Sequence, residues 1–221
     1  HEMAKLSLWI VQHQMNVVYS EILGEQRPTL PLSEPGNIVC ANSTSYEWNK
    51  ICPRNKDKHI YLVGNPPYSG AKLQTSDQKK DLASVFKNFK SYKNLDYIAC
   101  WFYLASKYIK DLNASFSFVS TSSISQGEQV SLLWPSIFNL GLEISFGYKP
   151  FEWSNHAKGN AGVTCVIIGI QNISNKNKKV IFQKTNQVLI SKNISPYLID
   201  FDPSIIINRE KKKLIIDKKK L

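Results

Sequence analysis

The stretch His59-Ile60-Tyr61-Leu62-Val63-Gly64-Asn65-Pro66-Pro67-Tyr68 joins an apolar run to a rigid polar tetrapeptide. Residues 59–63 predict a buried strand, which the glycine and the two prolines end. Each proline fixes its own φ, and the residue before a proline is pushed toward extended backbone. These rules explain why the prolines form a rigid turn. They do not explain why the residues on either side are Asn65 and Tyr68. Ligands of open α/β sheets bind beyond the carboxyl ends of the strands, so the tetrapeptide is the first candidate for a functional site.

The rest of the chain alternates amphipathic helices with short apolar runs. Apolar residues spaced by three and four predict helices over residues 3–19, 95–112 and 126–140. Apolar runs predict strands over residues 38–41, 59–63, 115–121, 142–148 and 162–170. Residues 70–93 are polar and Lys-rich, and we expect a mobile loop with a short helix there. The alternation predicts an α/β sheet, and the last two strands, with no helix between them, predict an antiparallel pair at one edge.

Chain length, the absence of long apolar windows and the spacing of the cysteines exclude several classes of protein. A chain of 221 residues has room for one domain, or one domain and part of another. No window approaches about eighteen uninterrupted apolar residues, so no membrane-spanning helix is predicted. The four cysteines are scattered without a CxxC pattern, which argues against a zinc site or a disulfide framework and for a reducing, intracellular setting.

The net charge of +11 is unevenly spread along the chain. Residues 173–221 carry twelve basic and four acidic side chains, a net +8. Such an excess indicates an acidic partner, nucleic acid before a membrane, with a solvated basic stretch as the alternative. The lysine runs at residues 211–213 and 218–220 are the parts of this stretch that could contact phosphates.

The tetrapeptide suits methyl transfer to an amine on a planar ring or to an amide nitrogen. The lone pair of such a nitrogen is delocalised, so it is a poor nucleophile. The Asn65 side-chain oxygen and the carbonyl of Pro66 can each accept one N–H hydrogen bond. Two acceptors outside the ring plane favour a tetrahedral nitrogen that can attack an electrophilic methyl group. Pro66 and Pro67 stiffen this geometry, and Tyr68 offers a flat face on which an extruded base can stack.

Asn-Pro-Pro-Tyr is also the motif by which the chain resembles amino-methyltransferases, chiefly N6-adenine DNA methyltransferases. More closely, the chain resembles the methyltransferase domain of MmeI-type single-chain type II restriction–modification enzymes. Collinear matching stretches lie at residues 4–10, 41–43, 47–48, 64–70, 95–97, 118–129, 151–159 and 166–169, with a fainter one at 195–198. The resemblance implies a Rossmann-like class I S-adenosylmethionine-dependent methyltransferase fold, of which this chain is the C-terminal part.

The resemblance assigns roles at the base pocket position by position. Asn65 and the Pro66 carbonyl would bind the adenine amino group, and Tyr68 would stack on the flipped base. Phe151 resembles the aromatic residue that packs on the other face of that base, with Trp153 as the alternative. No general base is required, because the amine proton can leave after methyl transfer.

The resemblance also implies where S-adenosylmethionine binds. Asn42, with Ser43, sits where the family places a polar residue that touches the cofactor's adenine ring, and Asn65 borders the same cofactor. Many members have Asp at the position of Asn42, but an Asn can still bind the cofactor's amino group through its oxygen. No G-x-G pattern occurs, so the Gly-rich turn and the acidic ribose ligand of this fold are expected upstream of His1, as is the family's nuclease domain.

We therefore expect residues 1–172 to be the catalytic part of the methyltransferase domain and 173–221 a basic connector toward a target-recognition domain. The isolated chain should be inactive and should bind S-adenosylmethionine weakly or not at all. His13 and His59 are interpreted as structural or surface residues, and Glu128 as a residue that orients a helix. His156 falls near the expected base pocket.

The sequence thus predicts a bacterial, cytoplasmic enzyme that methylates the N6 atom of an adenine flipped out of double-stranded DNA, as part of a restriction–modification system. S-adenosylmethionine is the expected cofactor, and no metal or membrane is expected. Two alternatives stay open. One is methylation of a protein glutamine amide, which uses the same Asn-Pro-Pro-Tyr chemistry, and the other is a DNA-binding module without catalysis.

Overall fold

The computed structural model describes residues 2–24, 38–153, 162–174, 178–183 and 187–206. The chain divides into two compact units, residues 1–54 and 55–221, and each is described by itself. The first unit contains α1 (Glu2–Leu23) and a short 3-10 helix, η1 (Trp48–Lys50). The helix predicted over residues 3–19 is confirmed and is one turn longer.

The strand predicted over residues 38–41 is wrong, because this run has no regular secondary structure and leads into a turn at residues 43–45. A strand exists only when its backbone groups pair with those of a neighbour. Among the described residues, no strand pairs with 38–41. The side chain of Val39 is 45% exposed, so this apolar run is not buried either.

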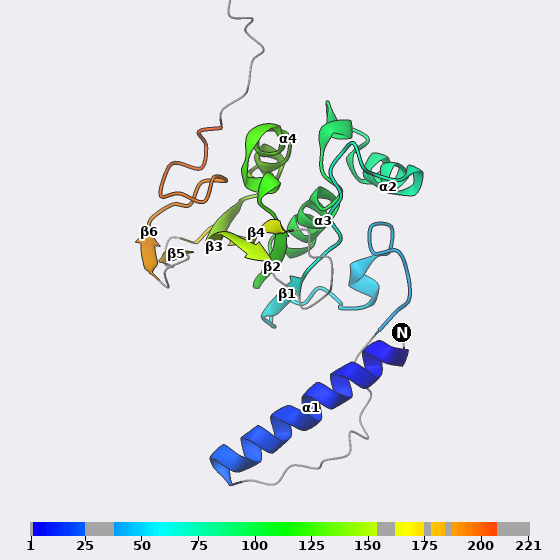
Figure 1. The fold of residues 1–221 in the computed structure, drawn as a ribbon, viewed down its shortest axis with the longest axis vertical. Helices are drawn as coiled ribbons and strands as arrows, with labels where there is room; N and C mark the ends of the chain where they lie inside the picture. Colours follow the sequence, from blue (N-terminus) through cyan, green and yellow to red (C-terminus); the bar gives the residue numbers. More distant parts are fainter. Residues whose placement is uncertain (1, 25–37, 154–161, 175–177, 184–186, 207–221) are drawn as a thin grey trace, which may run out of the picture. The chain divides into compact units, whose positions relative to one another are not determined.

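The second unit is built on one six-stranded sheet (Figure 1). Its strands are β1 (Ile60–Gly64), β2 (Ala114–Thr121), β3 (Leu142–Trp153), β4 (Val163–Asn172), β5 (Lys179–Phe182) and β6 (Val188–Ser191). They lie in the order β1-β2-β4-β3-β5-β6. β1 is parallel to β2 and β3 is parallel to β5, while β4 is antiparallel to both β2 and β3. The strands β1, β2, β3 and β5 therefore end at the same edge, here called the carboxyl edge, where β4 begins.

The predicted α/β sheet and the antiparallel pairing of β3 with β4 are confirmed. The predicted place of this pair was wrong, because β5 and β6 extend the sheet beyond β3 and leave the pair in its interior. These two strands have only four residues each, and the sequence predicts no strand after residue 170. They also lie C-terminal to the boundary predicted at residue 172.

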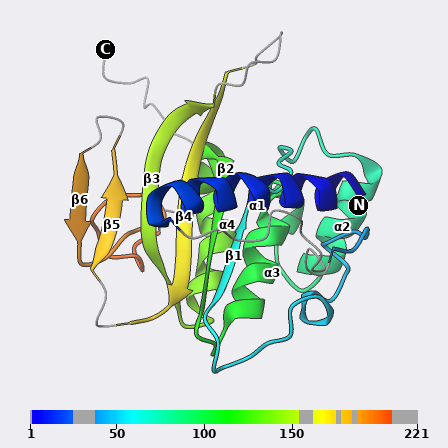
Figure 2. The same cartoon turned by 90° about the horizontal axis from the view of Figure 1, so that it is seen from below.

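Helices α3 (Ala99–Ile109) and α4 (Gly127–Phe138) cover one face of the sheet, behind the strands in Figure 2. Phe102 of α3 is fully buried and makes edge contacts with Phe116 and Phe118 of β2, at ring-centroid distances of 5.8 and 5.5 Å. Trp134 of α4 is equally buried and lies 6.3 Å from the same Phe102 ring. These aromatic contacts form the core between the helices and the sheet. Helices predicted over 95–112 and 126–140 are thus confirmed in shorter form.

The segment between β1 and α3 contains α2 (Ser76–Phe86) and the 3-10 helix η2 (Tyr92–Asn94). Thr75 and Gln78 form a capping box at the start of α2, in which each side chain bonds to the other residue's backbone N–H. The short helix predicted within residues 70–93 is thereby confirmed. Of the helices that the structure describes, none combines the length and apolar character that crossing a membrane requires.

Gly169 of β4 pairs with Phe146 of β3, whose ring covers it. A Cβ atom on Gly169 would lie 2.1 Å from Phe146 Cε1, so the Phe146 ring or the backbone near it would have to move. We expect Gly169→Ala to destabilise the protein by about 1–3 kcal/mol, the usual cost of overpacking. Urea unfolding would measure this. Gly162→Ala is the matched control, because a Cβ there meets no atom within 4 Å among the described residues. Equal stabilities of the two variants would contradict the prediction.

Candidate functional site

The tetrapeptide Asn65-Pro66-Pro67-Tyr68 follows β1 directly, at the carboxyl edge of the sheet. Gly64, the last residue of β1, pairs with Phe118 of β2, which fixes the point where the loop leaves the sheet. Pro66 is buried, whereas Asn65 is exposed. Within the described part of the chain, no group forms a hydrogen bond with the Asn65 side chain. The amide of Asn65 is thus presented by a loop whose next residue is anchored in the protein.

The Tyr68 hydroxyl lies within electrostatic reach of the Cys165 thiol, so the two groups affect each other's pKa. Burial, with a smaller contribution from Cys165, raises the pKa of Tyr68 above its usual value. Cys165 is fully buried near the start of β4, and its partners in register are Thr121 of β2 and Phe151 of β3. Residues paired across neighbouring strands point to the same face of a sheet. Phe151 therefore lies on the same face as Cys165, the residue whose thiol affects the pKa of Tyr68.

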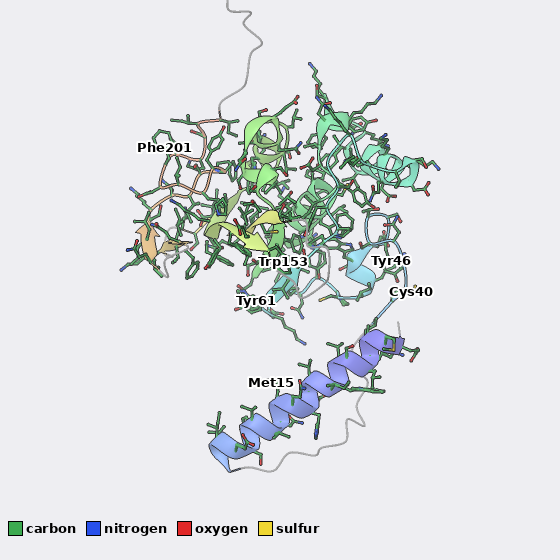
Figure 3. The ribbon with its side chains drawn as sticks, in the orientation of Figure 1. Met15, Cys40, Tyr46, Tyr61, Trp153 and Phe201 are labelled. Atoms are coloured by element: carbon green, nitrogen blue, oxygen red, sulfur yellow. The ribbon has the colours of Figure 1, made fainter. Side chains whose placement is uncertain are left out.

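The end of β3 carries a run of aromatic side chains. Phe151 contacts Tyr148 edge-on at 5.3 Å and lies 6.3 Å from the Trp153 ring. The register of β3 against β4 shifts between Tyr148 and Phe151, which changes the direction of the strand end. Trp153, labelled in Figure 3, is the last residue of β3. His156 lies outside the described residues.

The exit of the tetrapeptide is held by residues that sequence reasoning missed. The carbonyl of Ser69 accepts hydrogen bonds from the backbone N–H of Tyr97, at 2.9 Å, and from Gln74 Nε2, at 3.3 Å. Gln74 Nε2 also donates to the carbonyl of Leu95, at 2.8 Å, and the residue is only 5% exposed. Gln74 thereby joins the loop after the motif to the chain before α3. No local pattern marks such a residue, because its partner Leu95 is 21 positions away.

A series of hydrogen-bonded polar side chains links the residues before α3 to the end of β2. Ser123 Oγ donates to Asp96 Oδ2 at 2.6 Å and lies 2.7 Å from Thr121 Oγ1. On the other side, Glu128 accepts a hydrogen bond from Asn94 Nδ2 at 2.9 Å, which holds the start of α4 against η2. This contact agrees with the predicted orienting role of Glu128. The residues that follow β1 and β2 are thus bonded to each other along the carboxyl edge.

Asn42 and Ser43, predicted to bind the cofactor, belong to the first compact unit. Asn42 Oδ1 accepts hydrogen bonds from Thr44 N, at 3.0 Å, and from Thr44 Oγ1, at 2.8 Å. The carbonyl of Ser43 accepts from Trp48 Nε1 at 2.8 Å. These bonds form a local turn that fixes both residues. The structure brings Asn65, Tyr68, Phe151 and Trp153 to one edge of the second unit.

The reactivity of the four cysteines tests whether Cys165, near the site, is buried in the folded protein. Burial raises the pKa of the Cys165 thiol, and it raises that of Cys100 to about 12. A raised pKa lowers the fraction of reactive thiolate at a given pH. At mildly alkaline pH we expect a thiol reagent to label the exposed Cys40 and Cys52 quickly, and Cys100 and Cys165 only after denaturant is added. Mass spectrometry of the labelled peptides checks this. Fast labelling of Cys165 in the folded protein would show that Tyr68 does not cover it.

Comparisons with known proteins show which family and which fold this chain resembles. The family model described as the DNA-methyltransferase domain of MmeI matches residues 1–183. A curated relative, DNA methyltransferase A of Bacillus subtilis (strain 168), is 46% identical over 212 residues, which cover 96% of this chain and 24% of the relative.

A solved structure, that of the type IIL restriction–modification enzyme MmeI in complex with DNA, is similar with a TM-score of 0.81 and 39% identity. The similarity covers 92% of this chain and 27% of that one. The chain thus spans about a quarter of the length of each of these proteins. The structural likeness confirms the predicted Rossmann-like methyltransferase fold.

Proposed function

The chain belongs to the family of the MmeI DNA-methyltransferase domain, as its sequence resemblance predicted, and from this premise we propose that it is the base-binding and methyl-transferring part of a DNA methyltransferase. The observation that carries the proposal is the placement of Asn65-Pro66-Pro67-Tyr68. The motif follows a strand at the carboxyl edge, with the Asn65 amide exposed and Tyr68 within electrostatic reach of Cys165, the residue that pairs with Phe151.

The proposed reaction is transfer of a methyl group to the N6 amino group of adenine. The Asn65 oxygen and the Pro66 carbonyl accept the two N–H bonds of this group and stabilise the tetrahedral nitrogen that forms in the transition state. The anchored loop lets these acceptors act without rearrangement, because Pro66 is buried and Ser69 is bonded to Gln74 and Tyr97. The reaction needs positioning and no covalent intermediate with the protein.

The base is proposed to lie between Tyr68 and Phe151. An enzyme that modifies a base in a duplex must first extrude it from the stack, and aromatic faces then replace the lost stacking. The rings of Tyr68 and Phe151, both in the described part of the chain, make no direct contact with each other. Phe151 pairs with Cys165, whose thiol affects the pKa of Tyr68, whereas Trp153 pairs with Val163 two residues earlier. This register favours Phe151 over Trp153 as the second face.

S-adenosylmethionine is the proposed cofactor, and when bound it supplies an electrophilic methyl group. Asn65 would border it, and Asn42 and Ser43 would hold its adenine ring. The fit at Asn42 is partial. Its Oδ1 atom already accepts two hydrogen bonds from Thr44, so a bond from the cofactor's amino group to this oxygen would have to displace one of them.

The proposed setting is a restriction–modification enzyme of the bacterial cytoplasm that acts on double-stranded DNA. Support comes from the similar MmeI enzyme, whose structure contains DNA, and the family match favours DNA over a glutamine amide as the methyl acceptor. Residues 1–172 are proposed as the catalytic part and 173–221 as the connector toward a target-recognition domain. That connector begins within the sheet, since β5 and β6 belong to it.

Replacing the acceptor tests the proposed chemistry. In the complete protein, Asn65→Ala should abolish methyl transfer and leave DNA binding almost unchanged, because the lost hydrogen bond matters most in the transition state. Transfer of a radioactive methyl group to DNA measures the first effect, and fluorescence anisotropy with a labelled duplex measures the second. Asn113→Ala, an exposed Asn just before β2 at the opposite edge, is the control. If Asn65→Ala methylates DNA at the rate of the control variant, Asn65 has no catalytic role and serves only in the turn.

Replacing the aromatic residues tests the proposed stack. Phe151→Ala should weaken binding of the extruded base by about 1–3 kcal/mol, the usual worth of one base–aromatic contact. Trp153→Ala should have a smaller effect. A duplex with 2-aminopurine at the target position measures extrusion directly, because this base fluoresces strongly once it leaves the stack. A larger loss of fluorescence with Trp153→Ala than with Phe151→Ala would exchange the two assignments.

A further inference from the structure

The segment from Gly70 to Lys93 carries a surplus of positive charge beside the proposed base pocket. It contains six lysines and two aspartates, and both carboxylates are engaged. Asp77 pairs with Lys80 at 2.9 Å, and Asp81 accepts a hydrogen bond from the Tyr97 hydroxyl at 2.7 Å. The lysines that remain form no ion pair within the described residues and are all exposed: Lys72, Lys79, Lys87, Lys90 and Lys93. We call these five residues the lysine surface.

The lysine surface is a fixed part of the fold. One side of α2 is buried through Leu82 and Phe86. The ring centroid of Phe86 lies 5.2 Å from that of Tyr103 of α3. The capping box of Thr75 and Gln78 fixes the first turn of α2. Side chains that end in nitrogen atoms project around α2 and the segment after it (Figure 3). Charges fixed in this way can act as a preformed binding surface.

Both ends of the segment return to the exit of the tetrapeptide. Lys72 lies two residues before Gln74, and Lys93 lies two residues before Leu95, the residues joined by the Gln74 side chain. Gln74 also donates to Ser69, which follows Tyr68 directly. Lys72 and Lys93 therefore stand close to the loop that presents Asn65. A base that enters this pocket stays attached to its own strand, so the flanking phosphates must come to the same edge.

The opposite edge of the sheet also carries lysines in its described residues, among them Lys178 and Lys192 at the adjoining ends of β5 and β6. Lys56 and Lys58 precede β1 there, with Asp57 between them, and Lys110 precedes β2 with Asp111 beside it. Asp57, Asp111 and Glu143 lie among the lysines of that edge, and Glu143 pairs with Lys179 at 2.6 Å. The lysine surface differs from that edge in its position, because it adjoins the exit of the tetrapeptide.

We propose that the lysine surface binds the phosphate backbone of the duplex next to the target base, with Lys72 and Lys93 nearest to it. This proposal rests on the proposed function and names the part of the chain that holds the DNA substrate. Phosphate contacts position a protein on DNA and carry no sequence information. Lysines in this role add to the affinity for every duplex alike and to the dependence of that affinity on salt.

The test compares two double variants of the complete protein, Lys72→Gln/Lys93→Gln and the control Lys56→Gln/Lys58→Gln. Binding to a labelled duplex of arbitrary sequence is followed by fluorescence anisotropy over a series of salt concentrations. The slope of log affinity against log salt should become shallower by about 1.8 for the first variant, since each lost phosphate contact removes about 0.9. The control should keep the wild-type slope. Thermal unfolding of both variants at the wild-type temperature verifies that the fold is intact.

A second measurement separates binding from chemistry. Lys72→Gln/Lys93→Gln should need a higher DNA concentration to reach half of its maximal methylation rate, whereas the control Lys56→Gln/Lys58→Gln should methylate as the wild type does. An unchanged salt slope, or equal changes in both double variants, would overturn the proposal for the lysine surface. That result is distinct from failure of the proposed function, in which the wild-type protein itself would not methylate DNA.

Discussion

The site depends on the reversed direction of β4 between β2 and β3. Because β4 is antiparallel to both neighbours, its first residues meet the last residues of β2 and β3 at the carboxyl edge. Thr121, Cys165 and Phe151 form one row across the three strands, and the Cys165 thiol in the middle of this row affects the pKa of Tyr68. A shift of β4 by one residue would turn Cys165 to the other face. The pairing of β4 therefore determines whether Tyr68 and Phe151 can face the same base.

The opposite side of the site is fixed by a second long-range contact. Gln74 bonds the exit of the tetrapeptide to Leu95, and Tyr97 bonds the same Ser69 carbonyl through its backbone. The loop that carries Asn65 is therefore restrained at both ends, by the β1–β2 pairing before it and by Gln74 after it. Acceptors held in this way stabilise a transition state without the cost of ordering them during the reaction.

The sequence predicted the elements that carry a clear apolar pattern, and failed where pairing partners decide. The strands predicted over residues 59–63, 115–121, 142–148 and 162–170 correspond to β1, β2, β3 and β4, and the helices predicted over 95–112 and 126–140 correspond to α3 and α4. Residues 38–41 have the same apolar composition as a strand, but no described strand pairs with them. β5 pairs with the edge of β3, and β6 pairs with β5. The four residues of each strand carry no pattern that predicts this pairing.

The same distinction applies within the site. Asn65 and Tyr68 could be found because their motif is contiguous, and Phe151 because a resemblance supplied its position. Cys165, whose thiol affects the pKa of Tyr68, and Gln74, which bonds the exit of the tetrapeptide, are known only from contacts that span long stretches of chain. Different packing contacts fix the Asn65 amide and the lysine surface. The β1–β2 pairing fixes the position of Asn65, whereas the buried face of α2 fixes that of the lysine surface. Chemistry and DNA affinity can therefore be altered separately, because separate packing contacts position the residues proposed for each.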